Sequence, residues 1–126
     1  MKKIISTNNA PAAIGPYSQA VEANGTLYIS GQIPVNAATG KIVEGGIIEQ
    51  TEQVFANIKA ILAEAGYGLE NVVKSTVFLA DMSFFAEMNE VYKKYYSENC
   101  PARSTIAVKG LPLGALVEIE TIAVKF

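Results

Sequence analysis

The chain has 126 residues, of which 50% are hydrophobic and 17% are charged, so it fits one domain (residues 1–126) with its own core. A net charge of −2 with dispersed lysines disfavours nucleic-acid binding, which calls for a basic face. The chain has no histidine, which excludes Ser-His-Asp and Cys-His catalysis and most catalytic zinc sites.

The first residues, Met1-Lys2-Lys3-Ile4-Ile5, carry charge but lack the apolar segment of a signal peptide. We predict a strand at Lys2–Ser6, then a loop at Asn8–Pro16 that is punctuated by glycine and proline. A single cysteine excludes an internal disulfide, so a cytoplasmic protein is expected. No apolar run approaches the roughly 20 residues of a membrane helix, and no membrane partner is expected.

Tyr17 follows this loop. Either it is a site residue whose hydroxyl is available to a ligand, or its ring packs at the edge of a sheet. Ser18–Ala23 and Thr26–Ser30 flank Asn24-Gly25, which is the sequence pattern of a β-hairpin with a type I′ turn. Gly31 comes next, where the missing side chain permits either a close ligand approach or a bulge.

After a turn region at Pro34–Gly40, residues Gly46–Ala65 show the periodicity of an amphipathic helix that stops at Gly66. Its polar residues, Gln50 and Asn57 among them, mostly take the outer face. The apolar face, which we interpret as core, comprises Ile47, Ile48, Thr51, Val54, Phe55, Ile58, Ile61, Leu62 and Ala65.

Val72–Ala80 is predicted to be a strand with two largely apolar faces, so both faces require cover. A second helix is capped by Asp81 or Ser83 and extends to about Ser97. Its apolar stripe comprises Phe84, Phe85, Met88, Val91, Tyr92, Tyr95 and Tyr96. Asn89 lies beside the stripe. Its amide either contacts a ligand or is a solvated polar side chain.

Arg103 is the only arginine of the chain, and it follows the rigid Pro101 at the mouth of a predicted strand, Ser104–Lys109. A guanidinium held by stiff backbone is suited to grip a carboxylate through two parallel hydrogen bonds. The alternative is an exposed arginine in an ordinary ion pair.

After a tight loop at Gly110–Gly114, the last predicted strand, Ala115–Phe126, carries Glu118 and Glu120 on one face, roughly 7 Å apart. Semi-buried carboxylates among apolar neighbours have to be paired or functional. The element order predicts an α+β fold with two helices packed on one face of a mixed sheet. The apolar second face then predicts a homo-oligomer closed by sheet-to-sheet packing.

Five motifs, in order along the chain, resemble the Rid (reactive intermediate deaminase, YjgF) family, and most of all its RidA-like 2-iminobutanoate/2-iminopropanoate deaminases. They are Ala12-Ala13-Ile14-Gly15-Pro16-Tyr17-Ser18-Gln19, Ser30-Gly31-Gln32-Ile33-Pro34, Val73-Lys74-Ser75-Thr76-Val77-Phe78-Leu79, Pro101-Ala102-Arg103-Ser104-Thr105 and Val117-Glu118-Ile119-Glu120. The resemblance implies a chorismate-mutase-like fold, a homotrimer with clefts between subunits, and no cofactor or metal. It also implies hydrolysis of enamine and imine intermediates, such as 2-aminoacrylate, to 2-keto acids and ammonia.

The resemblance assigns two catalytic residues: Arg103 binds the substrate carboxylate, and Glu118 holds and activates the attacking water. The other substrate-binding positions are Tyr17 (offered from the neighbouring subunit), Ser30, Gly31, Asn89 and Thr105, which contributes mainly backbone contacts. No role carries over to Cys100.

Two alternatives to this enzyme remain. One is a non-catalytic module that binds or senses 2-keto acids or other small carboxylates with the same arginine. Glu118 favours catalysis, because a carboxylate beside an anionic ligand weakens simple binding. The other is RNA cleavage or translation inhibition, attributed to some relatives, which the acidic pI and the missing histidine disfavour.

Overall fold

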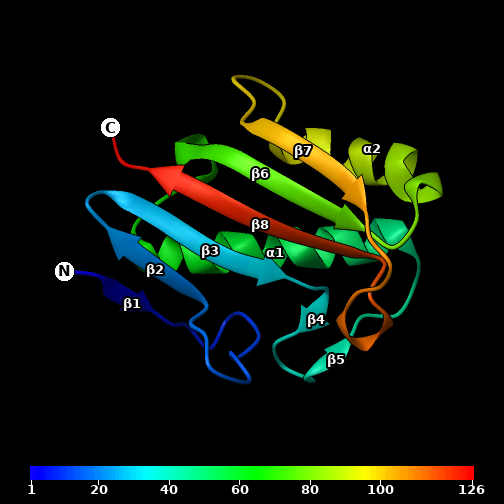
Figure 1. Ribbon diagram of the computed structural model, residues 1–126, viewed down its shortest axis with the longest axis horizontal. Helices are drawn as coiled ribbons and strands as arrows, with labels where there is room; N and C mark the ends of the chain where they lie inside the picture. Colours follow the sequence, from blue (N-terminus) through cyan, green and yellow to red (C-terminus); the bar gives the residue numbers. More distant parts are fainter.

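The computed structural model describes residues 1–126 and is built on a six-stranded mixed sheet with strand order β1-β2-β3-β8-β6-β7 (Figure 1). The strands are β1 (Lys3–Ile5), β2 (Ala20–Ala23), β3 (Thr26–Gln32), β8 (Val117–Val124), β6 (Val72–Leu79) and β7 (Ala102–Ala107). Only β6 and β7 run parallel. A two-stranded sheet joins β4 (Val35–Asn36) to β5 (Lys41–Ile42).

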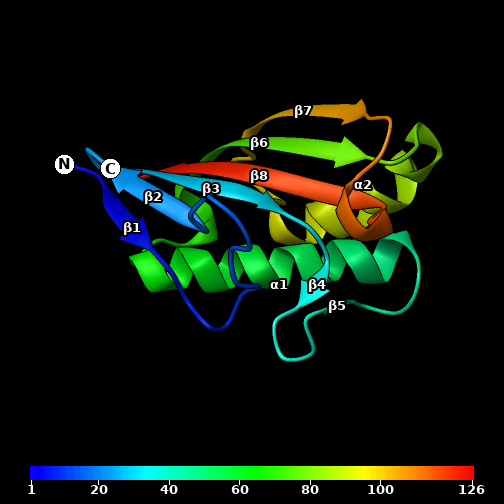
Figure 2. The same ribbon diagram turned by 60° about the horizontal axis from the view of Figure 1, so that its bottom comes forward.

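The helices α1 (Ile47–Ala65) and α2 (Phe85–Tyr95) lie together on one face of the sheet, which confirms the predicted α+β architecture (Figure 2). The helix α1 begins after Gly46 and ends at Gly66, which has a left-handed φ of 80°. Its apolar face is core, because Val54, Phe55, Ile58 and Ile61 are fully buried. Three short 3-10 turns complete the fold: η1 (Leu69–Asn71), η2 (Met82–Phe84) and η3 (Pro112–Gly114).

Three positions of α1 differ from the prediction made from its periodicity. Ile48, expected in the core, is 41% exposed, whereas Gln50 and Asn57 are buried. Gln50 Oε1 accepts a hydrogen bond from the backbone N–H of Leu116, and Asn57 Nδ2 donates to the carbonyl of Val35. Both amides are therefore buried because they bind the backbone of distant segments, which periodicity within the helix does not reveal.

The predicted hairpin is confirmed, with positive φ at Asn24 (51°) and Gly25 (75°) between β2 and β3. Several boundaries differ from the prediction: β4 begins inside the expected turn Pro34–Gly40, α2 ends at Tyr95, and β8 is shorter than Ala115–Phe126. The strand β7 begins two residues earlier than expected, because Ala102 already pairs with β6. Arg103 therefore lies inside the strand and not at its mouth.

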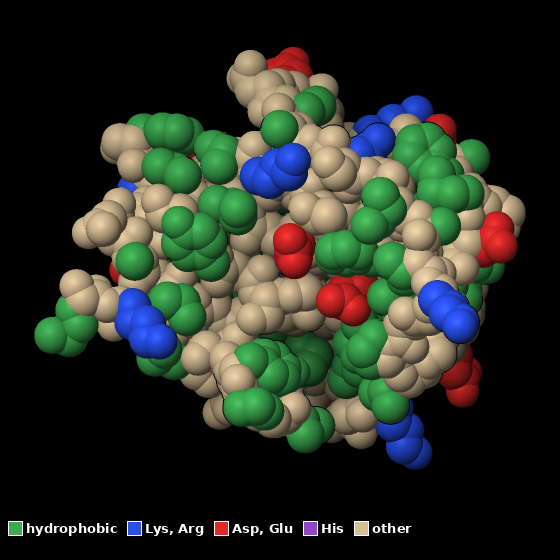
Figure 3. All heavy atoms as spheres, in the orientation of Figure 1, with side chains coloured by type: hydrophobic (Ala, Val, Ile, Leu, Met, Phe, Trp, Pro, Cys, Tyr) green, Lys and Arg blue, Asp and Glu red, His purple; other side chains and the backbone are tan.

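The second face of the sheet carries no helix and remains apolar, as predicted from β6 and β8. On this face Tyr28 is 50% exposed and Ile106 47%. Figure 3 views this open face, where hydrophobic side chains surround a few acidic ones. The homo-oligomer predicted from this apolar surface stays a prediction. None of the helices has the length and apolar composition needed to cross a bilayer.

Candidate active site

Arg103 is held by one face of α2, whose residues Phe85, Asn89 and Tyr92 follow one another at i, i+4 and i+7. Arg103 Nη1 donates a hydrogen bond to Asn89 Oδ1 at 2.8 Å. The guanidinium carbon lies 4.6 Å from the centre of the Tyr92 ring and 5.5 Å from that of Phe85. An amide oxygen and two aromatic faces thus stabilise the cation without neutralising its charge.

The charge of Arg103 has no carboxylate partner in the chain. Ion pairs join Lys93 to Glu90, Lys94 to Glu52 and Lys125 to Glu22, and none includes Arg103. The side chain is half-buried, so the exposed arginine in an ordinary ion pair is not what the structure shows. A guanidinium has five N–H donors, and only one hydrogen bond to a side chain is made here, so it is well placed to bind an external carboxylate.

Thr105 lies two residues beyond Arg103 on the same face of β7. Its hydroxyl is buried and makes no hydrogen bond. The hydroxyl of Tyr92 is also buried without a partner, and burial raises the pKa of Tyr92. Arg103, Asn89 and Thr105 therefore form one group, on the helix-covered side of the sheet.

A second group forms on the open side of the sheet, around Gly31 and Glu118. The pairing of β3 with β8 shifts register between Ile29 and Gln32, so Gly31 lies in a bulge. A Cβ placed on Gly31 would overlap the carboxylate of Glu118. The bulge expected at this glycine is therefore present, and the carboxylate of Glu118 occupies the space that a side chain would take. Close approach of a ligand to Gly31 stays a prediction.

Glu118 is half-buried and has no ion-pair partner in the chain. Burial, together with the charge of Glu120, raises its pKa above the ordinary value for a glutamate. A carboxylate with a raised pKa is a better proton acceptor from water than an exposed one. This side chain can therefore serve as a general base.

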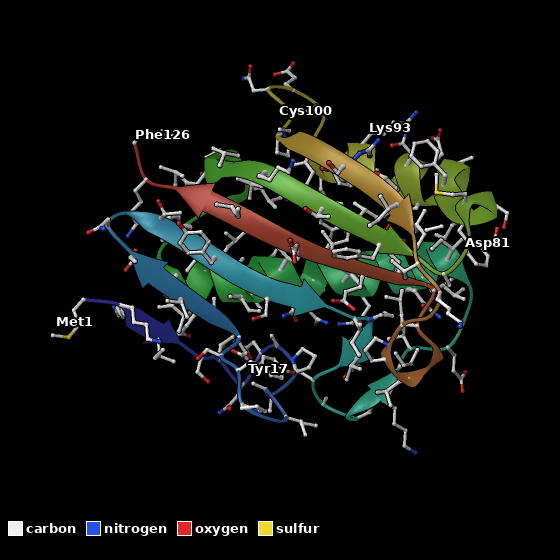
Figure 4. The ribbon with its side chains drawn as sticks, in the orientation of Figure 1. Met1, Tyr17, Asp81, Lys93, Cys100 and Phe126 are labelled. Carbon is white, nitrogen blue, oxygen red and sulfur yellow. The ribbon has the colours of Figure 1, made fainter.

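Ser30 and Tyr17 lie near this second group. Ser30 Oγ donates to the carbonyl of Ser18 at 2.6 Å, so its hydroxyl ties β3 to the segment that leads into β2. Tyr17 is 53% exposed, and its hydroxyl accepts a long hydrogen bond of 3.4 Å from the N–H of Ile14. Figure 4 shows Tyr17 in the loop before β2, at the edge of the molecule where β4 also lies. Tyr17 and Gly31 line one cavity.

One chain does not bring Arg103 and Glu118 together. In the sheet register, Arg103 is opposite Ser75 on β6, while Glu118 is opposite Phe78. Three residues separate these two rows, which places the side chains on opposite faces and about 10 Å apart along the strands. The predicted site residues thus form two half-sites: Arg103, Asn89 and Thr105, and Tyr17, Ser30, Gly31 and Glu118.

Tyr92 and Phe85 were missed as site residues by the sequence analysis, which assigned both to the core stripe of α2. Their spacing with Asn89, which places all three on one face of the helix, was visible in the sequence. Only the folded chain shows that this face of α2 packs against Arg103 of β7.

Cys100 is exposed, and its Sγ donates to the carbonyl of Tyr96 at 3.1 Å. No group of three or more His, Cys, Asp or Glu side chains lies close enough together to hold a metal ion.

Residues 7–125 match the family model described as Endoribonuclease L-PSP. A mouse protein named 2-iminobutanoate/2-iminopropanoate deaminase is 50% identical over 99% of this chain and 93% of its own length. The crystal structure of a Rid-family protein of Yersinia pestis has a TM-score of 0.96 at 50% identity, covering 99% of this chain and all of that one. Escherichia coli TdcF with bound serine has a TM-score of 0.94 at 42% identity, covering 98% and 99% of the two chains.

Proposed function

Because this chain belongs to the Endoribonuclease L-PSP (Rid) family, we propose that it is an enzyme that hydrolyses small 2-imino acids and their enamines to 2-keto acids and ammonia. The substrates are 2-aminoacrylate, 2-iminopropanoate and 2-iminobutanoate. The observation that carries the proposal is Arg103, a half-buried cation that neutral groups hold and that no carboxylate of the chain neutralises. Every proposed substrate brings such a carboxylate.

The reaction requires that the substrate be oriented toward the attacking water and that one group accept a proton from that water. Arg103 binds the substrate carboxylate, while Glu118 accepts a proton as the water oxygen bonds to the imine carbon. The C=N π pair moves to nitrogen, which takes up the proton that Glu118 received. The hydroxyl of this tetrahedral intermediate then gives up its proton and nitrogen gains one, the C–N bond breaks with its electron pair on nitrogen, and the carbonyl and ammonia are formed. An imine is already electrophilic, so neither a histidine nor a cofactor is needed.

The complete site forms between two copies of the chain in a homotrimer. One copy supplies Arg103, Asn89 and Thr105, and its neighbour supplies the half-site around Glu118. Two observations support this arrangement: the half-sites lie on opposite faces of one sheet, and the open face of that sheet exposes apolar side chains such as Tyr28. A single-domain, cytoplasmic enzyme is part of the proposal.

The test couples the protein to a PLP-dependent threonine or serine dehydratase that makes the intermediate in place. Wild-type protein is expected to accelerate the release of 2-ketobutyrate or pyruvate, and Arg103→Ala to abolish the gain while the assembly survives. Lys109→Ala is the matched control, because it removes an exposed cation close to β7. An unchanged rate in Arg103→Ala protein would exclude the proposed mechanism.

A binding module without turnover is the second candidate, and the serine bound to TdcF is the observation on a relative that favours it. Such a module would use Arg103 in the same way, with 2-keto acids as ligands. Calorimetry with 2-ketobutyrate separates the two functions. Binding without any acceleration of imine loss would establish the module instead of the enzyme.

A further inference from the structure

Gln32 directly follows Gly31 of the Glu118 half-site, but the proposed mechanism gives it no part. It is the last residue of β3, and its side chain is buried, with an exposed fraction of 6%. A buried amide lowers stability unless it is hydrogen-bonded, so its partner indicates what the amide does there. Gln32 Nε2 donates to the carbonyl of Ser30 at 3.1 Å, and this hydrogen bond spans Gly31.

The residue that the hydrogen bond spans lies in the β-bulge. Ile29 pairs with Thr121 and Gln32 pairs with Ile119, so three residue steps along β3 oppose two along β8. The extra residue of a bulge is left out of the regular ladder. The position of the backbone at Gly31 therefore depends on hydrogen bonds other than those of the ladder.

The bulge is tied to its surroundings from two sides. On the side toward β2, the N–H of Ser30 donates to the carbonyl of Gln19 at 2.9 Å, and Ser30 Oγ donates to the carbonyl of Ser18 at 2.6 Å. On the other side, the amide of Gln32 holds the Ser30 carbonyl. These hydrogen bonds together restrict the backbone on both sides of Gly31.

The backbone of Gly31 in turn restricts the carboxylate of Glu118. A Cβ built on Gly31 would come within 2.0 Å of Glu118 Oε2, so the carboxylate occupies the space of the missing side chain. None of the ion pairs of the chain includes Glu118. A displaced bulge would therefore displace the group that accepts the proton from water.

We propose that Gln32 is a positioning residue: its hydrogen bond to the Ser30 carbonyl fixes the bulge at Gly31 and thereby the point at which Glu118 meets the attacking water. The inference rests on the proposed function. In this role Gln32 acts through the backbone and not by contact with the substrate. Displacement of a reacting group by about 1 Å can lower a rate by roughly a hundredfold, so one hydrogen bond in the bulge is enough to affect catalysis.

The test compares kcat and KM of Gln32→Met with those of the wild type, on 2-iminobutanoate made in place by a threonine dehydratase. Methionine keeps nearly the length of glutamine and removes the amide. We expect kcat to fall by about tenfold or more, whereas KM stays that of the wild type because Arg103 still binds the carboxylate. Gln53→Met is the matched control, since it removes an amide on α1 that donates to Asn57 at 2.8 Å. Its kcat is expected to equal that of the wild type.

The pH profile of kcat/KM separates positioning from a general effect on the fold. Burial raises the pKa of Glu118, and the charge of Glu120 adds to this effect. A loosened bulge gives the carboxylate access to water and lowers this pKa toward its ordinary value. Because deprotonated Glu118 is the active form, the acidic limb in Gln32→Met is expected at lower pH. The substitution changes no charge around Glu118: β3 has no charged residue, and Glu120 and Lys74 of the same face remain.

A lower kcat together with a displaced acidic limb in Gln32→Met supports the inference. A wild-type kcat overturns it, and so does a lower kcat with the limb in place, because Gln32 would then not act through Glu118. If circular dichroism shows that Gln32→Met no longer folds, Gln32 is needed for stability and the inference is likewise overturned.

Gln32→Glu is a second variant, which keeps the shape of the side chain and replaces the donor Nε2 by an acceptor oxygen. Its kcat is expected to fall at least as far as that of Gln32→Met, because a carboxylate cannot donate to the Ser30 carbonyl. A wild-type kcat in Gln32→Glu would show that the donated hydrogen bond is not needed. Failure of the proposed function looks different, because the wild-type protein would then not accelerate the hydrolysis of the imine at all.

Discussion

Arg103 Nη1 and Asn89 Oδ1 lie 2.8 Å apart, in the one hydrogen bond that the guanidinium makes to a side chain of its own chain. The acceptor is neutral, so the bond orients the cation and leaves its charge available. The ring of Tyr92 completes the support from α2. An anion from outside the chain would therefore meet a guanidinium whose charge its own supports do not neutralise.

Asn89→Asp is expected to raise KM by about tenfold or more, because the new carboxylate pairs with Arg103 and competes with the substrate. The measurement compares kcat and KM of the variants with 2-iminobutanoate as the substrate. Asn99→Asp adds the same charge at an exposed position and serves as the control. Equal KM values for the two variants would contradict the orienting role of Asn89.

Tyr92→Leu is expected to raise KM several-fold, because leucine fills the volume but has no π face for the guanidinium. Tyr92→Phe keeps that face and removes a buried hydroxyl that makes no hydrogen bond, so it is expected to lose far less. Thermal denaturation of both variants controls for packing. The prediction fails if phenylalanine and leucine raise KM equally.

Glu120→Gln is expected to move the acidic limb of the pH profile of kcat/KM to lower pH. The charge of Glu120 helps to raise the pKa of Glu118, so removing that charge lowers this pKa. Glu118 has to be deprotonated to accept the proton of water, so activity is lost as pH falls through its pKa. Glu98→Gln, which removes an exposed carboxylate elsewhere, should leave the limb in place. A limb that does not move in Glu120→Gln argues against Glu118 as the base.

Gly31→Ala is expected to lower kcat by roughly a hundredfold or more. The new Cβ would displace the Glu118 carboxylate. Loss of a general base lowers the rate by about 10²–10⁴-fold. The circular dichroism spectrum should stay that of the wild type. Gly110→Ala is the matched control, since a Cβ there meets no atom within 4 Å. A kcat that is unchanged in Gly31→Ala would show that this carboxylate does not need its present position.

Local rules predicted the regular elements. The hairpin followed from Asn24-Gly25, whose positive φ angles only a few residue types adopt readily. The helix α1 followed from its periodicity and from Gly66, which ends it. The burial of the Gln50 and Asn57 amides could not be predicted from the periodicity of α1, because each amide binds backbone that is far away in the sequence. Burial of a polar side chain depends on a partner that periodicity does not identify.

Residue type and local spacing were enough to predict the element order, the single arginine behind a rigid proline and the apolar second face of the sheet. The contacts of Arg103 with Tyr92 and of Glu118 with Gly31 required the folded chain, since they join elements that are distant in the sequence. The same holds for the placement of Arg103 and Glu118 on opposite faces. Side chains alternate along a strand, so the register between β7, β6 and β8 fixes this separation.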